Sequence, residues 1–398
     1  MRSIDFDAHN EEVRRVWEAY RSGRPIRPPM ILGINVRYTM WRSDANHTGI
    51  GFERYFTDPD AMLLRQLEHK AWVRRHVPQD SEMGLPTAGW DVQVDFQNSY
   101  EAGWFGCPVR FFDGEVPDTE PQPTGEADKR NLIERGLPDP FEGGLMERNW
   151  AFYEHFLRRR EEGFEYEGLP LGEILPAGLG TDGPLTVACN LRGAGQFLID
   201  LAGDPDFARE FLEYITETTV ERIRAYRRRL GLPERSPGLA FADDAIQSIS
   251  LAMYRDLVLP SHRRLIDELS DGTAPNGIHL CGDATHHFGF LRDELDIQSF
   301  DTGFPVDFGQ LRAGLGPDVE IKGGPSVMFL QGATPEQVRQ EVRRILTTGV
   351  GDGRRLILRE GNNLPPDVDL ETLWAFYDAV QQFGVYDELD FGGAAACC

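Results

Sequence analysis

Short apolar runs alternate with helical patterns through the second half of the 398-residue chain. Each run has the length of a β-strand and precedes a helical or short connecting segment; the candidate strands are 238–243, 276–281, 296–301, 318–323 and 354–360. Strands that alternate with helices at this spacing indicate parallel βα units. Five such units favour an α/β fold of the (β/α)8 TIM-barrel type over an open sheet. No G-x-G-x-x-G sequence follows the first strand, which weakens the dinucleotide-binding alternative.

The clearest helix is predicted over residues 335–347. Thr334 is placed to cap it, Pro335 occupies its first position, and Gln337 stands where a capping box needs an amide. Apolar side chains recur along one side of this helix, at Val338, Val342, Ile345 and Leu346. This stripe predicts a helix that packs one face against the sheet.

The N-terminal half is less regular. An apolar run predicts a first strand at 30–36, and helical patterns or Asp-Pro capping signals predict helices at 11–20, at 58–77, at 145–162 and from 205 onward. Between residues 86 and 144 the periodicity is poor and prolines are frequent, which predicts a long irregular insertion such as a lid or rim over a site. We therefore expect one barrel domain over 1–390, with an extended N-terminal half, and a flexible C-terminal tail at 391–398.

Composition narrows the classes of partner. The net charge of −24 argues against binding to nucleic acid or to an anionic membrane surface, because both need basic patches. No apolar run reaches the length of a membrane span, and the first residues do not resemble a secretion signal, so a cytoplasmic location is expected. Five cysteines are too few and too scattered for a disulfide framework, and the vicinal pair Cys397-Cys398 falls in the expected tail.

Residues 277–283, with the sequence Gly-Ile-His-Leu-Cys-Gly-Asp, have the features of a strand end that binds a metal. Successive side chains of a strand point to opposite faces, so Ile278 and Leu280 face one way and His279 and Cys281 the other. Positions two apart lie roughly 6.6 Å apart along a strand, which lets an imidazole and a thiolate share one ion. In a barrel, the C-terminal ends of the strands hold the chemistry. The alternative is a buried cysteine beside a histidine that bonds the backbone.

The last predicted strand points to the same centre. Four of its residues share one face: Leu356, Leu358, Glu360 and Asn362. Glu360 is a candidate zinc ligand, and Asn362 is a weaker candidate because amide oxygens are poor zinc ligands. The alternative for Glu360 is an ion pair with an arginine of the rim, either Arg359 or Arg37.

Other strand ends contribute polar side chains that are candidates for substrate binding. The candidates are Asn35, Arg37 and Tyr38 after the first strand, and Asp244 (beside Asp243), Asp301 and Lys322 after later ones. Taken alone, each is more often a helix cap, a solvated charge or rim packing; together they describe a mouth lined with carboxylates and one amine. His286-His287, at the start of the next helix, is interpreted as a surface feature.

Several segments of the second half carry a family resemblance: Gly183-Pro184-Leu185-Thr186, Ala242-Asp243-Asp244 with Tyr254 and Pro260, His279-Leu280-Cys281-Gly282, residues 331–338 and residues 358–373. Through them the chain resembles the uroporphyrinogen decarboxylase superfamily, which also contains the zinc-dependent corrinoid methyltransferases. The resemblance covers most of 170–380 and is thin before residue 170. It implies a (β/α)8 barrel with its site at the C-terminal mouth.

The resemblance leaves two chemistries open. Porphyrinogen decarboxylases have R-Q-A-G-R-Y after the first strand, with two arginines that hold substrate carboxylates. The matching stretch here, 33–38, has Gly33 for the first arginine and keeps only Arg37. The late histidine of those enzymes falls on Asn362. Decarboxylation of a tetrapyrrole or of another carboxylated substrate is therefore the second interpretation.

The methyltransferases of the superfamily carry H-x-C on the strand that holds His279 and Cys281 here. Their second cysteine, on the last strand, falls on Asn362, so Glu360 completes the site, or zinc binds more weakly or is lost. The resemblance implies one zinc ion that lowers the pKa of a bound thiol, whose thiolate attacks a methyl group. His279 and Cys281 are accordingly the expected catalytic residues.

In this family the methyl group arrives on, or leaves to, a corrinoid. The corrinoid-binding pattern D-x-H-x-x-G has no complete match here, since residues 7–12 end in glutamate. The resemblance therefore implies a corrinoid carried by a separate partner protein, with a thiol or small methylated substrate. A metal-free binding protein on the same barrel is a third interpretation, from a different class.

Overall fold

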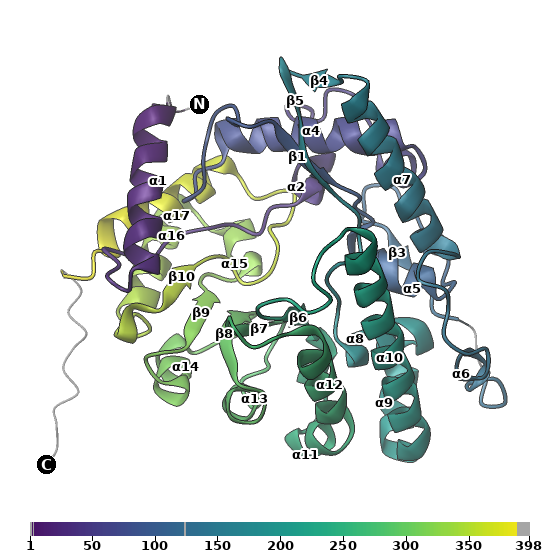
Figure 1. Cartoon of the computed structure of the whole chain (residues 1–398). Coiled ribbons are helices and arrows are strands. Elements are labelled where there is room, and N and C mark those ends of the chain that lie inside the picture. The colour runs from purple at the N-terminus through teal and green to yellow at the C-terminus, as the bar shows by residue number, and fades with distance from the viewer. Residues whose placement is uncertain (1, 3, 123–124, 388–398) are drawn as a thin grey trace, which may run out of the picture.

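The computed structural model describes residues 2, 4–122 and 125–387 (Figure 1). A five-stranded parallel sheet of order β10-β9-β8-β7-β6 holds the second half of the chain together. Its strands are β6 (Ala240–Ala242), β7 (Asn276–Leu280), β8 (Ile297–Thr302), β9 (Glu320–Gly323) and β10 (Leu356–Leu358). The α/β class and all five strands predicted in this half are confirmed, although all of them except β8 are shorter than expected.

Helical segments connect or follow these strands. They are η2 (Asp244–Ser248), α11 (Leu251–Met253), the π-helical turn η3 (Tyr254–Val258), α12 (Leu259–Leu269), α13 (Phe288–Leu295), α14 (Phe308–Leu315), α15 (Val327–Gly332), α16 (Pro335–Leu346), η4 (Asp352–Arg354) and α17 (Leu370–Phe383). In Figure 1, α12, α13 and α14 lie along one side of strands β6 to β8. The predicted capping box of α16 is confirmed, because Thr334 N–H donates to Gln337 Oε1 at 2.8 Å and Gln337 N–H donates to Thr334 Oγ1.

The N-terminal half is mostly helical. Its helices are α1 (Phe6–Arg21), α2 (Val36–Met40), α3 (Phe52–Thr57), α4 (Pro59–His76), η1 (Gln97–Ser99), α5 (Tyr100–Trp104), α6 (Asn131–Glu134), α7 (Gly144–Glu161), α8 (Pro184–Arg192), α9 (Ala194–Gly203) and α10 (Pro205–Arg229). The four predicted helices are confirmed as α1, α4, α7 and α10. Asp58 and Asp204 cap α4 and α10 with their side chains, as the Asp-Pro pairs predict.

A smaller sheet of order β1-β5-β4 lies in this half, with β1 (Trp90–Gln93), β4 (Glu165–Tyr166) and β5 (Leu169–Leu175). β1 and β5 are parallel. The two-stranded β2 (Val109–Arg110) and β3 (Asp118–Thr119) complete the strands of the described residues. β1 falls inside the segment 86–144, so that segment is not irregular throughout. The apolar–polar alternation of β1 spans only four residues, too short a pattern to stand out.

The predicted first strand at 30–36 is wrong except at its start. Met30 pairs with Leu358 of β10 as a single bridge, and α2 begins at Val36 because Asn35 Oδ1 accepts the backbone N–H of Arg37 at 3.0 Å. On the opposite edge of the sheet, Asp182 pairs with Ala242 of β6. We call residues 30–35 the Met30 segment. The barrel is not closed, since within the described residues no strand pairing joins this segment to β1.

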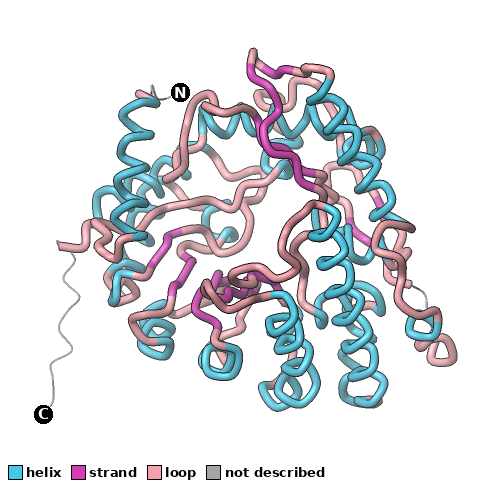
Figure 2. The backbone as a smooth tube through the Cα atoms, viewed as in Figure 1, coloured by secondary structure: helices cyan, strands magenta, loops and turns pink. Residues whose placement is uncertain are grey.

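Two groups of buried apolar side chains form the core. The larger one surrounds the five-stranded sheet and its helices, and the smaller one joins α3, α4 and α7 to β1 and β5. Figure 2 shows loops crossing the middle of the molecule, between the strands. A packed apolar core thus supports the strands whose C-terminal ends carry the candidate site residues.

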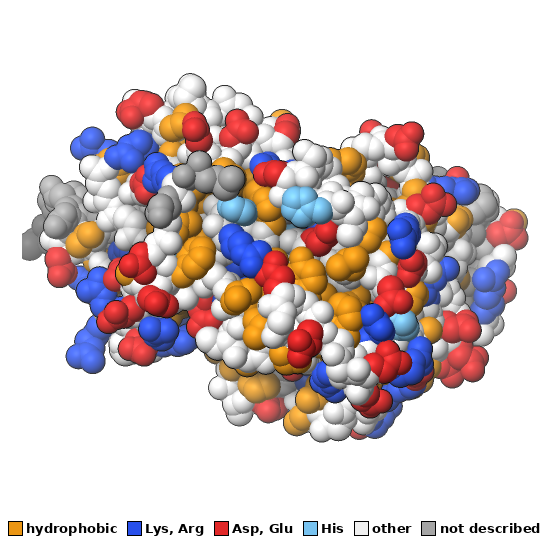
Figure 3. Space-filling view, turned by 90° about the horizontal axis from the view of Figure 1, so that it is seen from above, with side chains coloured by type: hydrophobic (Ala, Val, Ile, Leu, Met, Phe, Trp, Pro, Cys, Tyr) orange, Lys and Arg blue, Asp and Glu red, His pale blue; other side chains and the backbone are white. Residues whose placement is uncertain are grey.

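The surface carries many charged side chains (Figure 3), as expected for a chain in which 27% of the residues are charged. On the face drawn in Figure 3, acidic and basic side chains are interspersed. No helix of the described residues combines the length and apolar character that crossing a membrane requires. The predicted tail at 391–398, including Cys397-Cys398, lies outside the described residues.

Candidate metal centre

Strand β7 brings the predicted pair together. Ile278 and Leu280 are buried, whereas the side chain of His279 is 24% exposed. His279 Nε2 lies 3.1 Å from Cys281 Sγ. β6 and β8 flank β7, with His279 opposite Ala242 on one side and Asp301 on the other. Two potential metal ligands therefore meet at the C-terminal end of an interior strand.

Asp244 adds a third potential ligand from the neighbouring strand end. It follows β6 as the first residue of η2, and its Oδ1 accepts the backbone N–H of Cys281 at 2.8 Å. The same oxygen lies 3.9 Å from His279 Nε2. Among the described residues, Asp244, His279 and Cys281 form the one group whose His, Cys, Asp or Glu ligand atoms all lie within 4.8 Å of each other. We call this group the Asp-His-Cys cluster. Asp244 was expected at the mouth as a substrate residue, without a metal role.

Asp301 and Arg359 hold the imidazole of His279 in its orientation. Its Nδ1 lies 2.9 Å from Asp301 Oδ2, and that oxygen accepts a hydrogen bond from Arg359 Nη1 at 2.6 Å. Burial lowers the pKa of His279, but the hydrogen bond and charge of Asp301 outweigh it, so the pKa is raised overall. A carboxylate on the second ring nitrogen fixes a ligating histidine in many metal sites, and it leaves Nε2 free to face the cluster.

The carboxylates around Cys281 oppose ionisation of its thiol. Burial raises the pKa of Cys281, and the charges of Asp244, Asp301 and Asp182 raise it further. The pKa of Asp182 is itself raised, first by burial and then by Glu101, Asp244 and Asp243. Excess negative charge at a sulfur is the condition that a bound cation relieves.

A buried polar network holds the strand end that carries Asp244. Asp243, fully buried, accepts a hydrogen bond from His262 Nε2 at 2.7 Å, and His262 Nδ1 lies 2.9 Å from Tyr254 Oη. Asp243 Oδ1 also accepts the hydroxyl and backbone N–H of Thr186, at 2.7 and 2.8 Å. These bonds fix the backbone beside Asp244. His262 gave no signal in the sequence, because it lies on α12 and meets Asp243 only in the fold.

Glu360 contacts Arg359 and is not one of the residues of the Asp-His-Cys cluster. Its Oε1 accepts the backbone N–H of Gly33 at 2.6 Å and lies 3.7 Å from Arg359 Nη2, so the ion pair weighed as the alternative is present. Its Oε2 is buried without a hydrogen-bond partner among the described residues. Burial raises the pKa of Glu360 to about 8. The structure does not bring Glu360 into the Asp-His-Cys cluster.

Asn362 stands in a turn that β10 does not reach. The strand ends at Leu358, and Asn362 adopts a left-handed backbone with φ of 84°. Its Oδ1 accepts the backbone N–H of Asn363 at 2.8 Å. The strand alternation used to place Glu360 and Asn362 on one face therefore stops before both residues. Their ligation of a metal stays a prediction.

The remaining predicted residues lie at different places. Arg37 donates to Gln97 Oε1 at 2.6 Å, Tyr38 is fully buried and donates to Val368 O at 2.7 Å, and Asn35 caps α2. Lys322 lies 3.3 Å from Glu320 Oε1. Lys322, Asp301 and His279 together line a cavity of about 440 Å³ on the face of β6 to β9. Of these candidates, only Asp301 contacts the cluster directly.

The interpretation of His286-His287 as a surface feature is wrong for His287. Its side chain is fully buried, and Nε2 lies 2.8 Å from the carbonyl oxygen of Ile246. Burial and the neighbouring His286 lower the pKa of His287 to about 4, so it is neutral near pH 7. The pair ties the end of β7 to η2, because His286 Nε2 also lies 3.0 Å from Ile249 O.

Comparison with known proteins gives a consistent picture. The family model of uroporphyrinogen decarboxylase (URO-D) matches residues 96–383. A methylated-thiol–coenzyme M methyltransferase of Methanosarcina mazei is 29% identical over 341 residues, which cover 82% of this chain and 84% of that protein. A uroporphyrinogen decarboxylase of Pseudomonas syringae is 30% identical over 143 residues, which cover 34% of this chain and 38% of that protein.

A solved structure described as a methyltransferase from Methanosarcina mazei superposes with a TM-score of 0.64. It covers 93% of this chain and 98% of its own, at 15% sequence identity. At that identity the likeness shows a shared fold.

Proposed function

Because the chain belongs to the uroporphyrinogen decarboxylase family, we propose that it is a zinc-dependent methyltransferase with a (β/α)8 barrel fold. It transfers a methyl group between a corrinoid on a partner protein and a thiol or small methylated substrate, in the cytoplasm. The homology to a methylated-thiol–coenzyme M methyltransferase extends over 82% of the chain, whereas the decarboxylase match extends over 34%. The longer match favours methyl transfer over decarboxylation.

The observation that carries the proposal is the Asp-His-Cys cluster. An imidazole nitrogen, a thiol sulfur and a carboxylate oxygen within 4.8 Å of each other form a donor set suited to zinc. Burial, and then the surrounding carboxylates, raise the pKa values of Cys281 and Asp182, and a bound cation would offset this negative charge. The residues present therefore fit the metal that the family resemblance implies.

In this proposal His279, Cys281 and Asp244 hold the zinc, and the ion lowers the pKa of a thiol bound to it. Asp301 accepts a hydrogen bond from Nδ1 of His279 and so fixes the orientation of the ring, and Arg359 in turn donates a hydrogen bond to Asp301. The backbone N–H of Cys281 fixes Asp244. Glu360 is proposed as an additional ligand, because its Oε2 is buried without a partner among the described residues; Asn362 is a weaker one.

The cavity of about 440 Å³ beside His279 is proposed as the substrate space. Lys322 lines it and offers a positive charge to an anionic substrate group, while Asp301 bounds it at the cluster. Arg37, Tyr38 and Asn35 lie at the start of α2, where they are proposed to shape the rim.

Packing at position 33 also argues against tetrapyrrole decarboxylation. The family resemblance places a substrate-binding arginine of the decarboxylases at Gly33. A Cβ atom on Gly33 would lie 2.3 Å from Arg359 Nη2 and 2.7 Å from Glu360 Oε1. An arginine at position 33 would have to push both side chains aside, and Arg359 is the one that bonds Asp301.

The test is a methyl-transfer assay on the full-length chain loaded with zinc. Free methylcobalamin serves as the donor and 2-mercaptoethanesulfonate as the acceptor, and the corrinoid absorbance reports demethylation. We expect zinc-dependent turnover that Cys281→Ser abolishes and that Cys107→Ala, a buried cysteine outside the cluster, retains. No turnover with this or other small thiols, in protein shown to hold zinc, would contradict the proposed activity.

A further inference from the structure

The side on which the sheet is open is a built feature of the fold. Among the strands, the Met30 segment bonds β10 only, where Ile31 N–H donates to Leu358 O at 2.9 Å, and β1 bonds β5 only. Met30 O also accepts the backbone N–H of Asp80 at 2.6 Å. Over residues 4–122 and 125–387, no backbone hydrogen bond joins the Met30 segment to β1. We call the gap between these two strand edges the seam.

Side chains take the place of the missing strand on both edges of the seam. Met30 N–H donates to Asp80 Oδ2 at 2.6 Å, and Leu32 N–H donates to Gln79 Oε1 at 3.0 Å. On the other edge, Gln66 Nε2 donates to Gln93 O at 2.6 Å, and Gln93 N–H donates to Gln66 Oε1 at 3.3 Å. Since these backbone groups are already satisfied, the seam stays open without the cost of unpaired edges.

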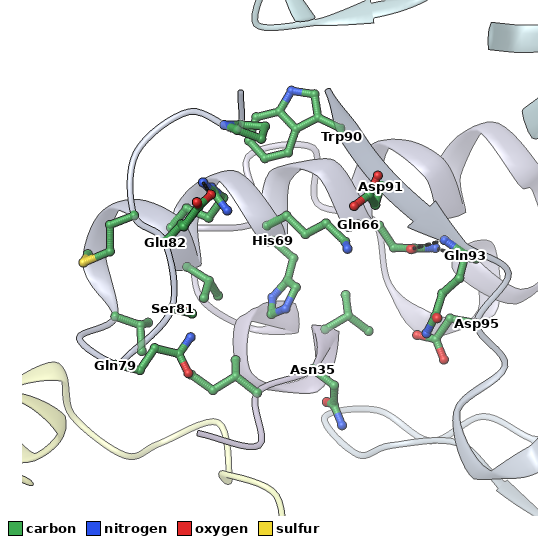
Figure 4. Close-up of a pocket in the computed structure, with 18 of the residues that line it drawn as sticks. Asn35, Gln66, His69, Gln79, Ser81, Glu82, Trp90, Asp91, Gln93 and Asp95 are labelled. Atoms are coloured by element: carbon green, nitrogen blue, oxygen red, sulfur yellow. Dashed lines mark hydrogen bonds and ion pairs between the residues drawn. The ribbon is translucent and has the colours of Figure 1, made fainter. Parts of the chain in front are cut away.

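Helix α4 crosses behind the seam and turns polar side chains toward it. Gln66 and His69 lie in the pocket of Figure 4, opposite Asp91 and Gln93 of β1. A helix that covers a sheet normally presents an apolar stripe, so these polar residues are unusual. His69 Nδ1 bonds Thr39 Oγ1 at 2.8 Å, and burial lowers its pKa to about 3, which leaves it neutral.

The seam encloses a pocket of about 400 Å³, which we call the seam pocket (Figure 4). A pocket of this size suits a small organic ligand. Apolar walls come from Ile34, Val36, Val73, Val77, Met83, Pro86 and Trp90. Polar groups reach it from α4, from β1 and from the loop between them, and Lys70 is among them.

Lys70 is the cation of this pocket that has no close counter-ion among the described residues. The chain contains only three lysines, against 38 arginines. Lys129 pairs with Asp204 at 2.7 Å and Lys322 with Glu320 at 3.3 Å. Lys70 is half-buried, and within the described residues it has no ion pair within 4.0 Å and no hydrogen bond. Burial lowers the pKa of Lys70, and the charge of Asp91, from beyond 4.0 Å, offsets this only in part, so an anion at closer range would stabilise the ammonium.

The carboxylates of the pocket are engaged elsewhere. Asp91 Oδ1 accepts the backbone N–H of Glu173 at 2.7 Å, Asp95 Oδ2 accepts Tyr55 Oη–H at 2.8 Å, and Glu82 lies 3.6 Å from Arg74 Nη2. Lys70 Nζ thus has no counter-ion within 4.0 Å among the described residues beside the apolar walls, although the charge of Asp91 still acts on it and partly offsets the lowering of its pKa by burial. We propose that the seam pocket binds a small organic monoanion, a carboxylate or sulfonate on an apolar chain, whose charged end pairs with Lys70 Nζ. This site is separate from the Asp-His-Cys cluster and does not depend on the proposed function.

The test is calorimetry on the full chain with three probes of equal length: hexanoate, pentane-1-sulfonate and the neutral hexanamide. We expect at least one anion to bind about 10- to 100-fold more tightly than hexanamide, the range for a hydrogen bond to a charged group. Lys70→Met, which keeps the chain length without the charge, should lose that advantage. Lys129→Met, the matched control, removes a lysine that is already paired and should bind like the parent.

A second measurement covers a folding defect in the variant. Limited acetylation of the parent chain, read by mass spectrometry, should show Lys70 protected by the bound anion and Lys129 unprotected. Binding of neither anion, equal binding of hexanamide, unchanged affinity in folded Lys70→Met, or absence of Lys70 protection would each overturn the proposal. Selective binding of one anion identifies its head group.

Discussion

Removing the carboxylate of Asp80 should lower the free energy of unfolding more than breaking any surface ion pair does. Asp80 accepts hydrogen bonds from Arg27 Nη1 and Nη2 at 2.6 and 2.7 Å and from Met30 N–H at 2.6 Å. The side chains of Arg27 and Asp80 are only 3% and 0% exposed. This pair ties the segment before β1 to the strand edge at Met30.

The magnitude follows from what Asp80→Ala leaves behind. A buried guanidinium without its partner costs about 3–5 kcal/mol. The Met30 N–H also loses its acceptor, which costs about 1–3 kcal/mol, although the two terms overlap. We expect a loss of at least about 4 kcal/mol in the free energy of unfolding, measured by urea denaturation with tryptophan fluorescence.

Two further variants make the reasoning refutable. Arg27→Met combined with Asp80→Leu removes both buried charges and should recover most of the stability lost in Asp80→Ala. Glu154→Ala breaks an ion pair with Arg229 whose side chains are 51% and 41% exposed, and it should cost less than about 1 kcal/mol. If Asp80→Ala costs no more than Glu154→Ala, or if the double variant is no more stable than Asp80→Ala, the buried pair does not hold this edge.

Three other predictions concern the site and the pH dependence. In a competition titration with a chromophoric chelator, Glu360→Gln should weaken zinc binding markedly, Asn362→Ala only slightly, and Asn362→Cys should tighten it; unchanged affinity in Asn362→Cys means that position 362 does not face the metal. The purified chain should not convert uroporphyrinogen to coproporphyrinogen, because Gly33 and Asn362 stand where the resemblance places two recognition groups, and clear turnover in a chromatographic assay would reverse our ranking of the two chemistries. Burial, then Arg65 and Lys70, lower the pKa of His69 to about 3. Below about pH 6.5 the unfolded chain therefore binds a proton at His69 that the folded chain does not bind, and the free energy of unfolding falls as pH falls. Between pH 6.5 and 4.5 this amounts to about 2–3 kcal/mol, which His69→Asn should remove from the pH dependence of urea unfolding; an unchanged profile would show that His69 does not titrate in this way.

The regular part of the fold could be predicted because each element carries its own signal. The apolar stripe and capping box of α16 are local, and so are the short apolar runs of β6 to β10. The Met30 segment misled the prediction because its apolar residues are buried although no strand pairs with it on the seam side. The side chains of Asp80 and Gln79, about 50 residues along the chain, accept the backbone N–H groups of Met30 and Leu32 instead.

The site could be predicted only where its residues share one strand. Spacing alone brings His279 and Cys281 together. Asp244 completes the cluster from a different strand end, and only the pairing of β6 with β7 sets that contact. The positions of Glu360 and Asn362 could not be extrapolated from strand alternation, because β10 ends at Leu358.

Metal analysis of the purified chain tests the central claim most directly. The protein is stripped with a chelator, reloaded with zinc, desalted and measured by inductively coupled plasma mass spectrometry, beside Cys281→Ser treated identically. We expect one zinc ion per chain in the parent and little in Cys281→Ser, with unchanged circular dichroism because the core does not depend on the metal. A parent chain that retains no zinc, or a Cys281→Ser chain that retains it fully, would contradict the assignment of the Asp-His-Cys cluster as the metal centre.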